Sequence, residues 1–448
     1  MITYWCELAW LGGDTAERAV VVTVTGGRIV DVLTGIHQPP PGSIVRHGLT
    51  MPGLANAHSH AFHRVLRGRT HAGTGSFWTW RDHMYAVATD LDPDRYYALA
   101  RATYGEMVLA GYTAVGEFHY LHHGPGGAPY ADPNAMGAAL MAAARDAGVR
   151  LTLLDTCYLR GGLDRDGTAI GLNPTQHRFA DTSAHAWAER ASGLRPTEAV
   201  RIGVAVHSVR ACAPADIALV ARWADAHDAP LHAHVSEQPA ENEACLAANG
   251  VTPTAVLDAA GALGPRFTAV HATHLTPGDV ALLGSRRCTA CFCPTTERDL
   301  ADGIGPASAL RAAGTRLSIG SDSQAVIDGF EETRGIELDE RLASLVRGRT
   351  PVTALLEAAT VDGHASIGWH DVGRIAIGQR ADLVTVSLSS VRTAGVAGTA
   401  ALAGVVFAAT ASDVTHVVVD GREVVTDGCH RSFDVAAELA AVLTRSNA

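Results

Sequence analysis

Two histidines separated by one residue stand directly after the apolar run at 52–57, and they are His58 and His60. On a β-strand, side chains two residues apart point to the same face, so both imidazoles could bind one metal ion. The spacing alone is weak evidence, because 22 histidines in 448 residues give about one such pair by chance. The position of the pair at the end of a strand-like run is what favours a metal site.

Three more strand-like runs end near side chains that bind metal ions or transfer protons. One run contains His234, and Glu237 follows three residues later, so a further imidazole ligand and a carboxylate would share one site. Another ends at His271, and a third is followed by Asp322. His232 repeats the His-x-His spacing, and it could hydrogen-bond to a residue that binds the metal ion. Three histidines and one carboxylate, with a position left open for water, are typical of catalytic zinc sites.

Eight strand-like runs alternate with amphipathic, Ala-rich segments along the middle of the chain. The runs lie at 43–57, 113–118, 150–156, 202–207, 231–235, 267–271, 289–293 and 317–321. The helical segments between them include 93–110, 134–147, 214–227, 240–249, 254–262 and 306–313. This alternation predicts a parallel sheet, and eight is the number of strands with which such a sheet closes into a barrel. The carboxyl ends of the strands then meet at one face, so the four clusters would lie together.

The two ends of the chain carry shorter strand-like pieces. They lie at 19–25, 28–33, 374–377, 382–387, 416–419 and 422–426. The dipeptides Gly26-Gly27 and Asp420-Gly421 predict hairpin turns between neighbouring pieces. Both ends are therefore expected to contribute strands to one small β-unit.

The domain organisation follows from these elements. With 448 residues, of which 47% are hydrophobic, the chain can bury a large core. We expect an α/β protein with a (β/α)8 TIM barrel at 51–369 and a small β-sandwich that combines 1–50 with 370–430. Residues 431–448 are expected to form a C-terminal helix.

Composition excludes several classes of partner. The net charge of −11 disfavours nucleic acid and polybasic membrane contacts. The first residues lack the basic region and apolar core of a signal peptide, and no apolar run of about 18 residues occurs, so no membrane segment is expected. Eight cysteines without a disulfide-scaffold spacing fit a reducing, cytoplasmic location. Because a net negative protein repels anions at long range, an anionic substrate needs cationic groups inside its pocket.

On these residues the chain resembles the amidohydrolase superfamily. The pattern of that superfamily is His-x-His after the first strand, one His after each of the fifth and sixth strands, and Asp after the eighth, and the resemblance covers nearly the whole chain. It implies one divalent ion, preferably zinc, held by His58, His60, His234 and Asp322. The His-x-x-Glu form at Glu237 is similar to the deaminase branch, in which the histidine after the sixth strand contacts the reacting water and is not a ligand. The resemblance therefore implies that His271 is catalytic.

Three further segments, at 76–81, 111–120 and 205–210, are similar to the formimidoylglutamate deiminase family. They are more specific than the metal pattern because they lie outside the shared ligand set. The resemblance implies that the substrate's carboxylates and amide region are held by Arg81, Tyr120, His207 and Arg210. A dicarboxylate needs buried, preferably bidentate, cationic partners, which arginines supply.

The chain departs from that family at two places. His63 stands where Gln is expected, and the run Glu297-Arg298-Asp299 differs from the expected sequence, in which Asn takes the place of Asp299. If these positions contact the substrate, specificity differs from that of the family. We include His63 among the expected substrate-binding residues.

The resemblance implies a hydrolytic deamination of N-formimino-L-glutamate to N-formyl-L-glutamate and ammonia, in histidine degradation, by a homodimer. Asp322 would take a proton from the attacking water, His271 would orient that water, and Glu237 would protonate the leaving nitrogen. This reaction needs a small anionic substrate and no macromolecular partner beyond a second copy of the chain.

Two alternatives stay open. The same site could deaminate a heterocycle such as a purine or pyrimidine, or another carboxylated amidine. A ring substrate would need an aromatic-lined pocket and would not need two arginines. In a different class, the chain could be a non-catalytic barrel, which the loss of a ligand would indicate, but every ligand position and Glu237 are present.

Two other clusters are weaker candidates for metal sites. His119, His122 and His123 lie close together, but no carboxylate pattern near them in the sequence supports a second metal site. The cysteines at 288–293 lack the second pair of a zinc ribbon, and they predict a buried barrel strand.

Overall fold

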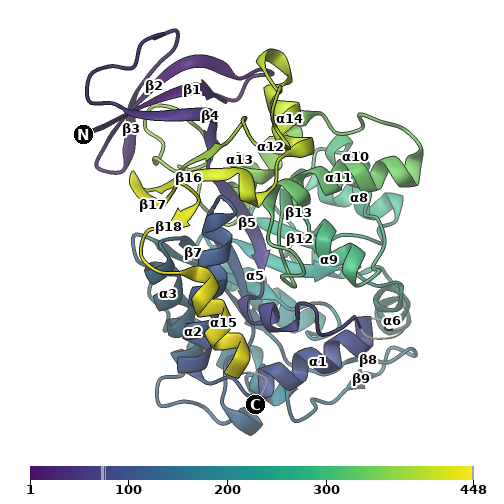
Figure 1. Ribbon diagram of the computed structural model, residues 1–448. Helices are drawn as coiled ribbons and strands as arrows, with labels where there is room; N and C mark the ends of the chain where they lie inside the picture. The colour runs from purple at the N-terminus through teal and green to yellow at the C-terminus, as the bar shows by residue number, and fades with distance from the viewer. Residues whose placement is uncertain (72–74, 76, 446–448) are drawn as a thin grey trace.

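Eight parallel strands close into a barrel in the computed structural model, which describes residues 1–71, 75 and 77–445 (Figure 1). The strands follow one another in chain order as β5 (Leu54–Ser59), β6 (Tyr112–His119), β7 (Arg150–Cys157), β10 (Val200–Val206), β11 (Leu231–Val235), β12 (Phe267–His271), β13 (Thr289–Phe292) and β14 (Arg316–Ile319). The chain after β14 closes on β5, because the Asp322 N–H donates to the His58 carbonyl at 3.0 Å and the His60 N–H donates to the Asp322 carbonyl at 3.2 Å. The predicted (β/α)8 fold is confirmed.

Helices lie outside the barrel strands (Figure 1). They are α2 (Pro93–Leu109), α3 (Ala135–Ala147), α4 (Ala184–Ala191), α5 (Pro214–Ala226), α6 (Pro239–Asn249), α7 (Pro253–Ala259), α8 (Pro277–Ser285), α9 (Pro294–Asp299), α10 (Ala307–Ala312), α11 (Gly329–Ser344), α12 (Val352–Ala359) and α13 (Val361–Ser366). Asp92, Thr252 and Asp328 cap α2, α7 and α11 by accepting first-turn N–H groups. Gly148 and Gly250 end α3 and α6 in the left-handed conformation.

Both ends of the chain form a second sheet, beside the barrel in Figure 1. Its strand order is β18 (Cys429–His430), β17 (Arg422–Thr426), β16 (Val414–Val419), β15 (Leu383–Val386), β4 (Ile44–Pro52), β1 (Ile2–Ala9), β2 (Glu17–Thr25) and β3 (Arg28–Leu33). This is the β-sandwich that the sequence predicts, and it has its own core, which includes Tyr4, Val22, Ile375 and Val418. The helices α14 (Ala401–Ala408) and α15 (Val435–Arg445) complete the C-terminal part, and residues 446–448 of the expected terminal helix lie outside the described residues.

Two strand predictions were wrong. The run at 43–57 is two strands, because β4 pairs within the sandwich and β5 within the barrel. Gly53 joins them where a β-carbon would stand 2.3 Å from the Thr113 side chain, so only glycine fits. The piece at 374–377 is not a strand: the chain turns there, and Gly373 and Gly378 at its borders both have positive φ.

A buried ion network joins the sandwich to the barrel. Arg150 begins β7 and donates to both carboxylate oxygens of Asp382, at 2.8 and 3.0 Å, with no exposed side-chain surface on either residue. Asp420 also pairs with Arg150 and, at 3.0 Å, with Arg380. Because Arg150 stands at the start of its strand, this network lies at the end of the barrel opposite the carboxyl ends.

Short elements surround the carboxyl ends of the strands. They are η1 (Ala61–Leu66), α1 (Phe77–Thr89), the hairpin of β8 (Gly162–Leu163) and β9 (Ala169–Ile170), and η3 (Gln176–Arg178). Side chains from η1, α1 and the hairpin line one cavity there. The barrel therefore supplies the floor of a pocket, and these insertions supply its walls.

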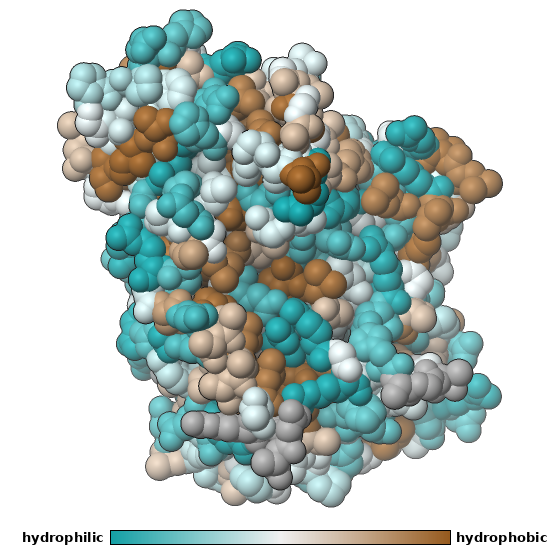
Figure 2. Space-filling view, viewed as in Figure 1, coloured by the Kyte–Doolittle hydropathy of each residue, from teal (hydrophilic) through white to brown (hydrophobic). Residues whose placement is uncertain are grey.

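The described surface mixes polar and apolar side chains (Figure 2). The last turn of α11 and the chain that follows it expose the large apolar side chains of Leu342, Leu345 and Val346, and Figure 2 shows hydrophobic atoms at the edge of the molecule where this segment lies. These residues do not line the cavity. No helix in the described part of the chain is long and apolar enough to cross a membrane.

Candidate active site

Three histidines and one aspartate converge at the carboxyl ends of the barrel strands. His58 Nε2 lies 3.2 Å from His234 Nε2 and 3.2 Å from Asp322 Oδ1. His60 Nε2 lies 3.4 Å from the same aspartate oxygen. The residues predicted as metal ligands are thus brought together: the ligand atoms of His58, His60 and Asp322 lie within 4.8 Å of one another, and His58 forms a second such group with His234 and His271.

Hydrogen bonds of the Nδ1 atoms determine the tautomer of two of these histidines. His60 Nδ1 donates to the carbonyl of Phe118, and His234 Nδ1 donates to the carbonyl of His207, both at 2.9 Å. The Nε2 atom of each ring is then unprotonated, and its lone pair is directed at the centre of the group. Histidines that bind metal ions are held in this way. Burial lowers the pKa of His58, His60 and His234, so the rings are neutral. Converging lone pairs beside a carboxylate fit a divalent cation.

The carboxylate of this group is ionised. Burial alone would raise the pKa of Asp322, but the hydrogen bond from His58 and the electrostatic interaction with neighbouring histidines, among them His271, lower it well below its usual range. The backbone of Asp322 has φ 41° and that of His271 has φ 65°, a region that side chains rarely adopt. Strained backbone of this kind clusters at functional sites, where the surrounding fold holds it in place.

His271 lies between two carboxylates. Its Nε2 is 3.7 Å from Glu237 Oε1 and 3.8 Å from Asp322 Oδ2. Its Nδ1 is 3.3 Å from Oε1 of the buried Glu297, which also accepts the Cys293 N–H at 2.9 Å. The three residues predicted to be catalytic are therefore neighbours, and Glu297 is a partner of His271 that the sequence pattern did not single out.

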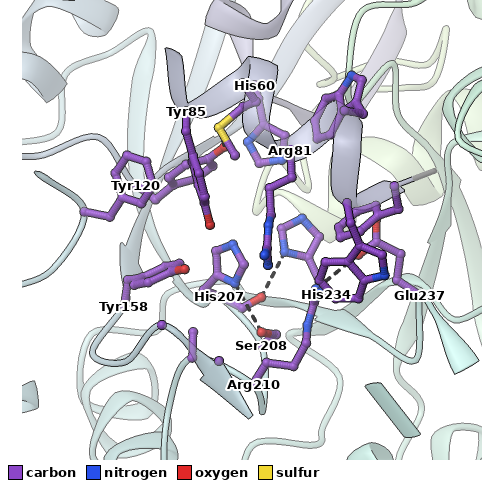
Figure 3. A pocket seen from close by; sticks show the side chains of 18 of the residues that line it. His60, Arg81, Tyr85, Tyr120, Tyr158, His207, Ser208, Arg210, His234 and Glu237 are labelled. Carbon is purple, nitrogen blue, oxygen red and sulfur yellow. Dashed lines mark hydrogen bonds and ion pairs between the residues drawn. The ribbon is translucent and has the colours of Figure 1, made fainter. Parts of the chain in front are cut away.

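A cavity opens beside this group, and it is lined by every residue predicted to bind substrate (Figure 3). These residues are Arg81, Tyr120, His207, Arg210 and His63. Figure 3 shows the Arg81 side chain reaching into the middle of the cavity, between the tyrosines and His234. Ser76, the first residue of the motif that contains Arg81, lies outside the described residues.

The two arginines of the cavity have different surroundings. Arg210 donates to Glu237 Oε2 at 3.1 Å and lies 3.8 Å from Glu241, so two carboxylates neutralise it. Arg81 stacks on Trp78, with its guanidinium carbon 4.6 Å from the ring centroid. Within the described ranges no carboxylate lies within 4.0 Å of the Arg81 guanidinium. Of the two arginines, Arg81 is therefore the one whose positive charge is available to pair with a ligand.

The two departures from the family sequence lie in different places. His63 Nε2 hydrogen-bonds to the Tyr120 hydroxyl at 2.9 Å in the cavity wall, and burial lowers the pKa of His63 to about 3. Arg298 instead pairs with Asp339 and Glu331 outside the cavity, and Asp299 pairs with His71. Of the two departures, only His63 is in a position to contact a ligand in the cavity.

The sequence missed several neighbours of the site. Tyr85, Tyr158 and Phe179 line the cavity but carry no spacing pattern. No carboxylate pattern accompanies the histidines at 119–123 in the sequence, but the fold brings Asp155 beside His119 and His122. Arg190 and the Trp187 indole N–H occupy both oxygens of that carboxylate, so the cluster is a buried ion network.

Comparison with known proteins identifies the family. The model of the Amidohydrolase family matches residues 49–424. The chain belongs to the amidohydrolase family. This amidohydrolase is 38% identical, over 403 residues and 87% of each chain, to the formimidoylglutamate deiminase of Pseudomonas aeruginosa, so the resemblance predicted from the sequence is confirmed. It is an enzyme that hydrolyses a carbon–nitrogen bond.

Solved structures match the whole of this amidohydrolase. An amidohydrolase from Brucella melitensis has a TM-score of 0.92 and 32% identity and covers 100% of both chains. An adenosine deaminase from Xanthomonas campestris with bound zinc has a TM-score of 0.84 and 25% identity and covers 100% of this chain and 97% of that one. The barrel and the second sheet are thus shared with other members of the family.

Proposed function

We propose that this amidohydrolase converts N-formimino-L-glutamate and water to N-formyl-L-glutamate and ammonia. The observation that carries the proposal is one cavity that holds both the converging imidazoles and two guanidinium groups, those of Arg81 and Arg210. In a chain of net charge −11, cations gathered in a pocket supply the local attraction that a dicarboxylate needs. The similarity to a formimidoylglutamate deiminase supports the same substrate.

The site would use one zinc ion, held by His58, His60, His234 and Asp322. Three neutral imidazole nitrogens and an ionised carboxylate are the donor set that catalytic zinc prefers, and a zinc-bound deaminase is among the similar structures. When bound, such an ion acts as a Lewis acid that lowers the pKa of water and so makes water a nucleophile at neutral pH.

Protein side chains would move the protons. Asp322 is ionised and can accept a proton from the attacking water. His271 lies between Asp322 and Glu237, so it is placed to hold the attacking oxygen against the formimino carbon. Glu237 would carry the proton to the leaving nitrogen, the usual role of a carboxyl group beside a reacting centre. The carbon–nitrogen bond then breaks and ammonia leaves, while the formyl group stays on the glutamate nitrogen.

The cavity wall would bind the rest of the substrate. Arg81, which has no carboxylate partner, offers a charge for one substrate carboxylate, and Arg210 offers a second when it exchanges Glu237 for the ligand. Tyr120, His207 and His63 would contact the amide region. Because His63 and Tyr120 are hydrogen-bonded to each other, they would act as one unit.

A ring-deaminating activity is the second candidate. The aromatic lining favours it, since the cavity wall includes Phe77, Trp78, Trp80, Tyr158 and Phe179. An adenosine deaminase is among the similar structures. A ring substrate makes no use of the charge on Arg81, so the Arg81→Met variant separates the two candidates.

The test is ammonia release by the zinc-loaded protein, with N-formimino-L-glutamate in one series and adenosine, guanine and cytosine in another. We expect turnover in the first series, with loss of that turnover in Arg81→Met and in Glu237→Gln at unchanged zinc content. Turnover of a ring that survives in Arg81→Met, without turnover of N-formimino-L-glutamate by the wild type, would contradict the proposal. The homodimer that the resemblance implies stays a prediction, for which sedimentation velocity is the measurement.

A further inference from the structure

Two tyrosine hydroxyls in the cavity wall share one hydrogen-bond donor. Tyr85 lies on α1, Tyr158 directly follows β7, and both side chains line the cavity. The side-chain nitrogen of Gln176 donates to the Tyr85 hydroxyl at 3.0 Å and to the Tyr158 hydroxyl at 2.8 Å. Figure 3 shows both hydroxyls turned toward the space beside His207.

Backbone contacts determine which end of the Gln176 amide faces the tyrosines. Its oxygen accepts the Asn173 N–H at 2.9 Å, and its nitrogen also donates to the Gly161 carbonyl at 3.1 Å. A reversed amide would lose both contacts, since it would place N–H against N–H and oxygen against oxygen. The amide nitrogen therefore faces the tyrosines. Its two hydrogens serve three acceptors, the two hydroxyl oxygens and the Gly161 carbonyl, and the nitrogen cannot accept a hydrogen from either hydroxyl.

Each hydroxyl must then direct its own hydrogen elsewhere. One tyrosine can donate to the other, but this uses only one of the two hydrogens. Apart from a hydrogen bond between the two hydroxyls themselves, no side chain or carbonyl in the described ranges accepts a hydrogen bond from Tyr85 or Tyr158. Burial and the neighbouring Tyr85 raise the pKa of Tyr158, so its hydroxyl keeps its proton. At least one O–H donor is therefore left to point into the cavity.

A cation lies beside these donors. The Arg81 guanidinium carbon is 5.5 Å from the ring centroid of Tyr85. Its Nε is buried without a hydrogen-bond partner among the residues that the structure describes. A guanidinium with free donors next to hydroxyl hydrogens forms a surface of donors without acceptors. The ligand group that fits such a surface is an anionic oxygen, and a carboxylate fits its planar donors best.

His207 lies next to both Tyr158 and one of the proposed metal ligands. The His207 ring centroid is 4.6 Å from that of Tyr158 and 5.0 Å from that of His234, so Tyr158 is one imidazole ring away from the ligand group. In N-formimino-L-glutamate the γ-carboxyl carbon is roughly five bonds, or about 6 Å, from the formimino carbon. The α-carboxyl carbon is only about three bonds away. The γ-carboxylate is the group that reaches the tyrosines.

We propose that Tyr85 and Tyr158, with Arg81, form the subsite for the substrate carboxylate that is farther from the formimino group. Gln176 is a positioning residue, since its amide nitrogen cannot accept from either hydroxyl and so leaves at least one O–H to donate into the cavity. This inference rests on the proposed function, because it names the subsite of that same substrate. The two hydroxyls and the amide belong to no metal or catalytic motif in the sequence.

The first test removes only the hydroxyls. In the full-length, zinc-loaded protein we compare wild type with the double variant Tyr85→Phe/Tyr158→Phe on two substrates, N-formimino-L-glutamate and N-formimino-L-norvaline. The second has a methyl group in place of the γ-carboxylate. For the glutamate substrate we expect KM to rise about tenfold to a hundredfold with little change in kcat, because the contact is equal in the ground and transition states. For the norvaline substrate we expect no change.

A control variant and a binding measurement accompany the kinetics. Tyr97→Phe removes a hydroxyl that donates to Asp146 at 2.7 Å outside the cavity, so its KM should equal that of wild type. Calorimetric titration with the product N-formyl-L-glutamate should show affinity weaker by the same tenfold to hundredfold in the double variant. This readout does not depend on turnover.

The second test changes the Gln176 side chain and leaves both tyrosines in place. In Gln176→Glu a carboxylate accepts both hydroxyl hydrogens and turns them away from the cavity, so KM for the glutamate substrate should rise as in the double variant. In Gln176→Met both hydroxyls rotate freely and can still donate, so KM should rise less than in Gln176→Glu. Equal effects of these two variants would contradict the positioning role of Gln176.

The outcomes separate this inference from the proposed function. If wild type releases no ammonia from N-formimino-L-glutamate, the proposed function fails and the subsite with it. If wild type is active and the double variant keeps the wild-type KM and product affinity, the subsite alone is refuted. An equal loss on the norvaline substrate would also refute it, because the tyrosines would then act on the shape of the pocket and not on the carboxylate.

Discussion

The substitution Glu297→Gln tests how His271 is held in place. Glu297 Oε1 lies 3.3 Å from His271 Nδ1 and accepts the Cys293 N–H at 2.9 Å. Both contacts are buried. Glutamine keeps the size of the side chain and one carbonyl acceptor, but it loses the negative charge. The substitution therefore weakens the support behind His271 and leaves the cavity unchanged.

The magnitude follows from the kind of contact that is lost. A carboxylate behind a functional imidazole is worth about tenfold to a hundredfold in activity, which corresponds to about 1.4–2.7 kcal/mol of activation free energy. The Cys293 N–H keeps an acceptor, so the free energy of unfolding should fall by only about 1 kcal/mol. We expect kcat to fall by that tenfold to hundredfold with KM nearly unchanged.

The assay combines steady-state kinetics, zinc content and a double-mutant cycle. If Glu297 acts through His271, the loss of kcat in Glu297→Gln/His271→Asn equals that in His271→Asn alone. Zinc content should equal that of wild type in all three variants, because neither residue is a proposed ligand. Additive losses would refute the positioning role of Glu297, and loss of zinc would refute the assignment of His271 as a residue outside the ligand set.

Three further predictions concern the buried ion network of Arg150, the role of Glu237 in proton transfer and the binding of zinc. Arg150→Met should lower the free energy of unfolding by about 3–5 kcal/mol in urea titrations, because it leaves the Asp382 carboxylate buried without its cation. The half-exposed pair of Arg28 and Asp371 is the control, and Arg28→Met should cost less than about 1 kcal/mol. Glu237→Gln should reduce kcat by about 10²–10⁴ at unchanged zinc content, and full activity in that variant would contradict its role in proton transfer. Removal of zinc by a chelator should lower the melting temperature, since an ion at a hundredfold excess over its Kd adds about 2.7 kcal/mol to stability. Zinc should restore the melting temperature in wild type but not in Asp322→Ala, and an identical response in both would argue against this ligand.

The metal group could be predicted from the sequence because its signal is local. His58, His60, His234 and Asp322 each stand at or just past the end of an apolar run, and the barrel brings all such ends to one face. The carboxylate behind His271 was not predictable in this way. Glu297 lies in the first turn of a helix after β13, and only the packing of that helix on the barrel brings it to β12.

Contacts between distant loops were also beyond prediction. The link from Gln176 to Tyr85 joins residues 91 positions apart, and no periodic pattern connects them. The pairing of Arg210 with Glu237 is a second example, because the sequence indicates two functional side chains but not that they neutralise each other. The division of 43–57 into two strands depends on which sheet each half joins, and an unbroken apolar run carries no sign of that choice.

The passage from β4 to β5 through Gly53 has a consequence for the order in which the protein folds during synthesis. β4 lies between β1, from the start of the chain, and β15, from its far end. The strand that leads directly into the one carrying His58 is therefore anchored on one side by residues that leave the ribosome late. Until β15 has been made, β4 exposes an unpaired edge in the nascent chain. The sheet next to the candidate metal site is thus completed only after the strands that follow the barrel have been synthesised.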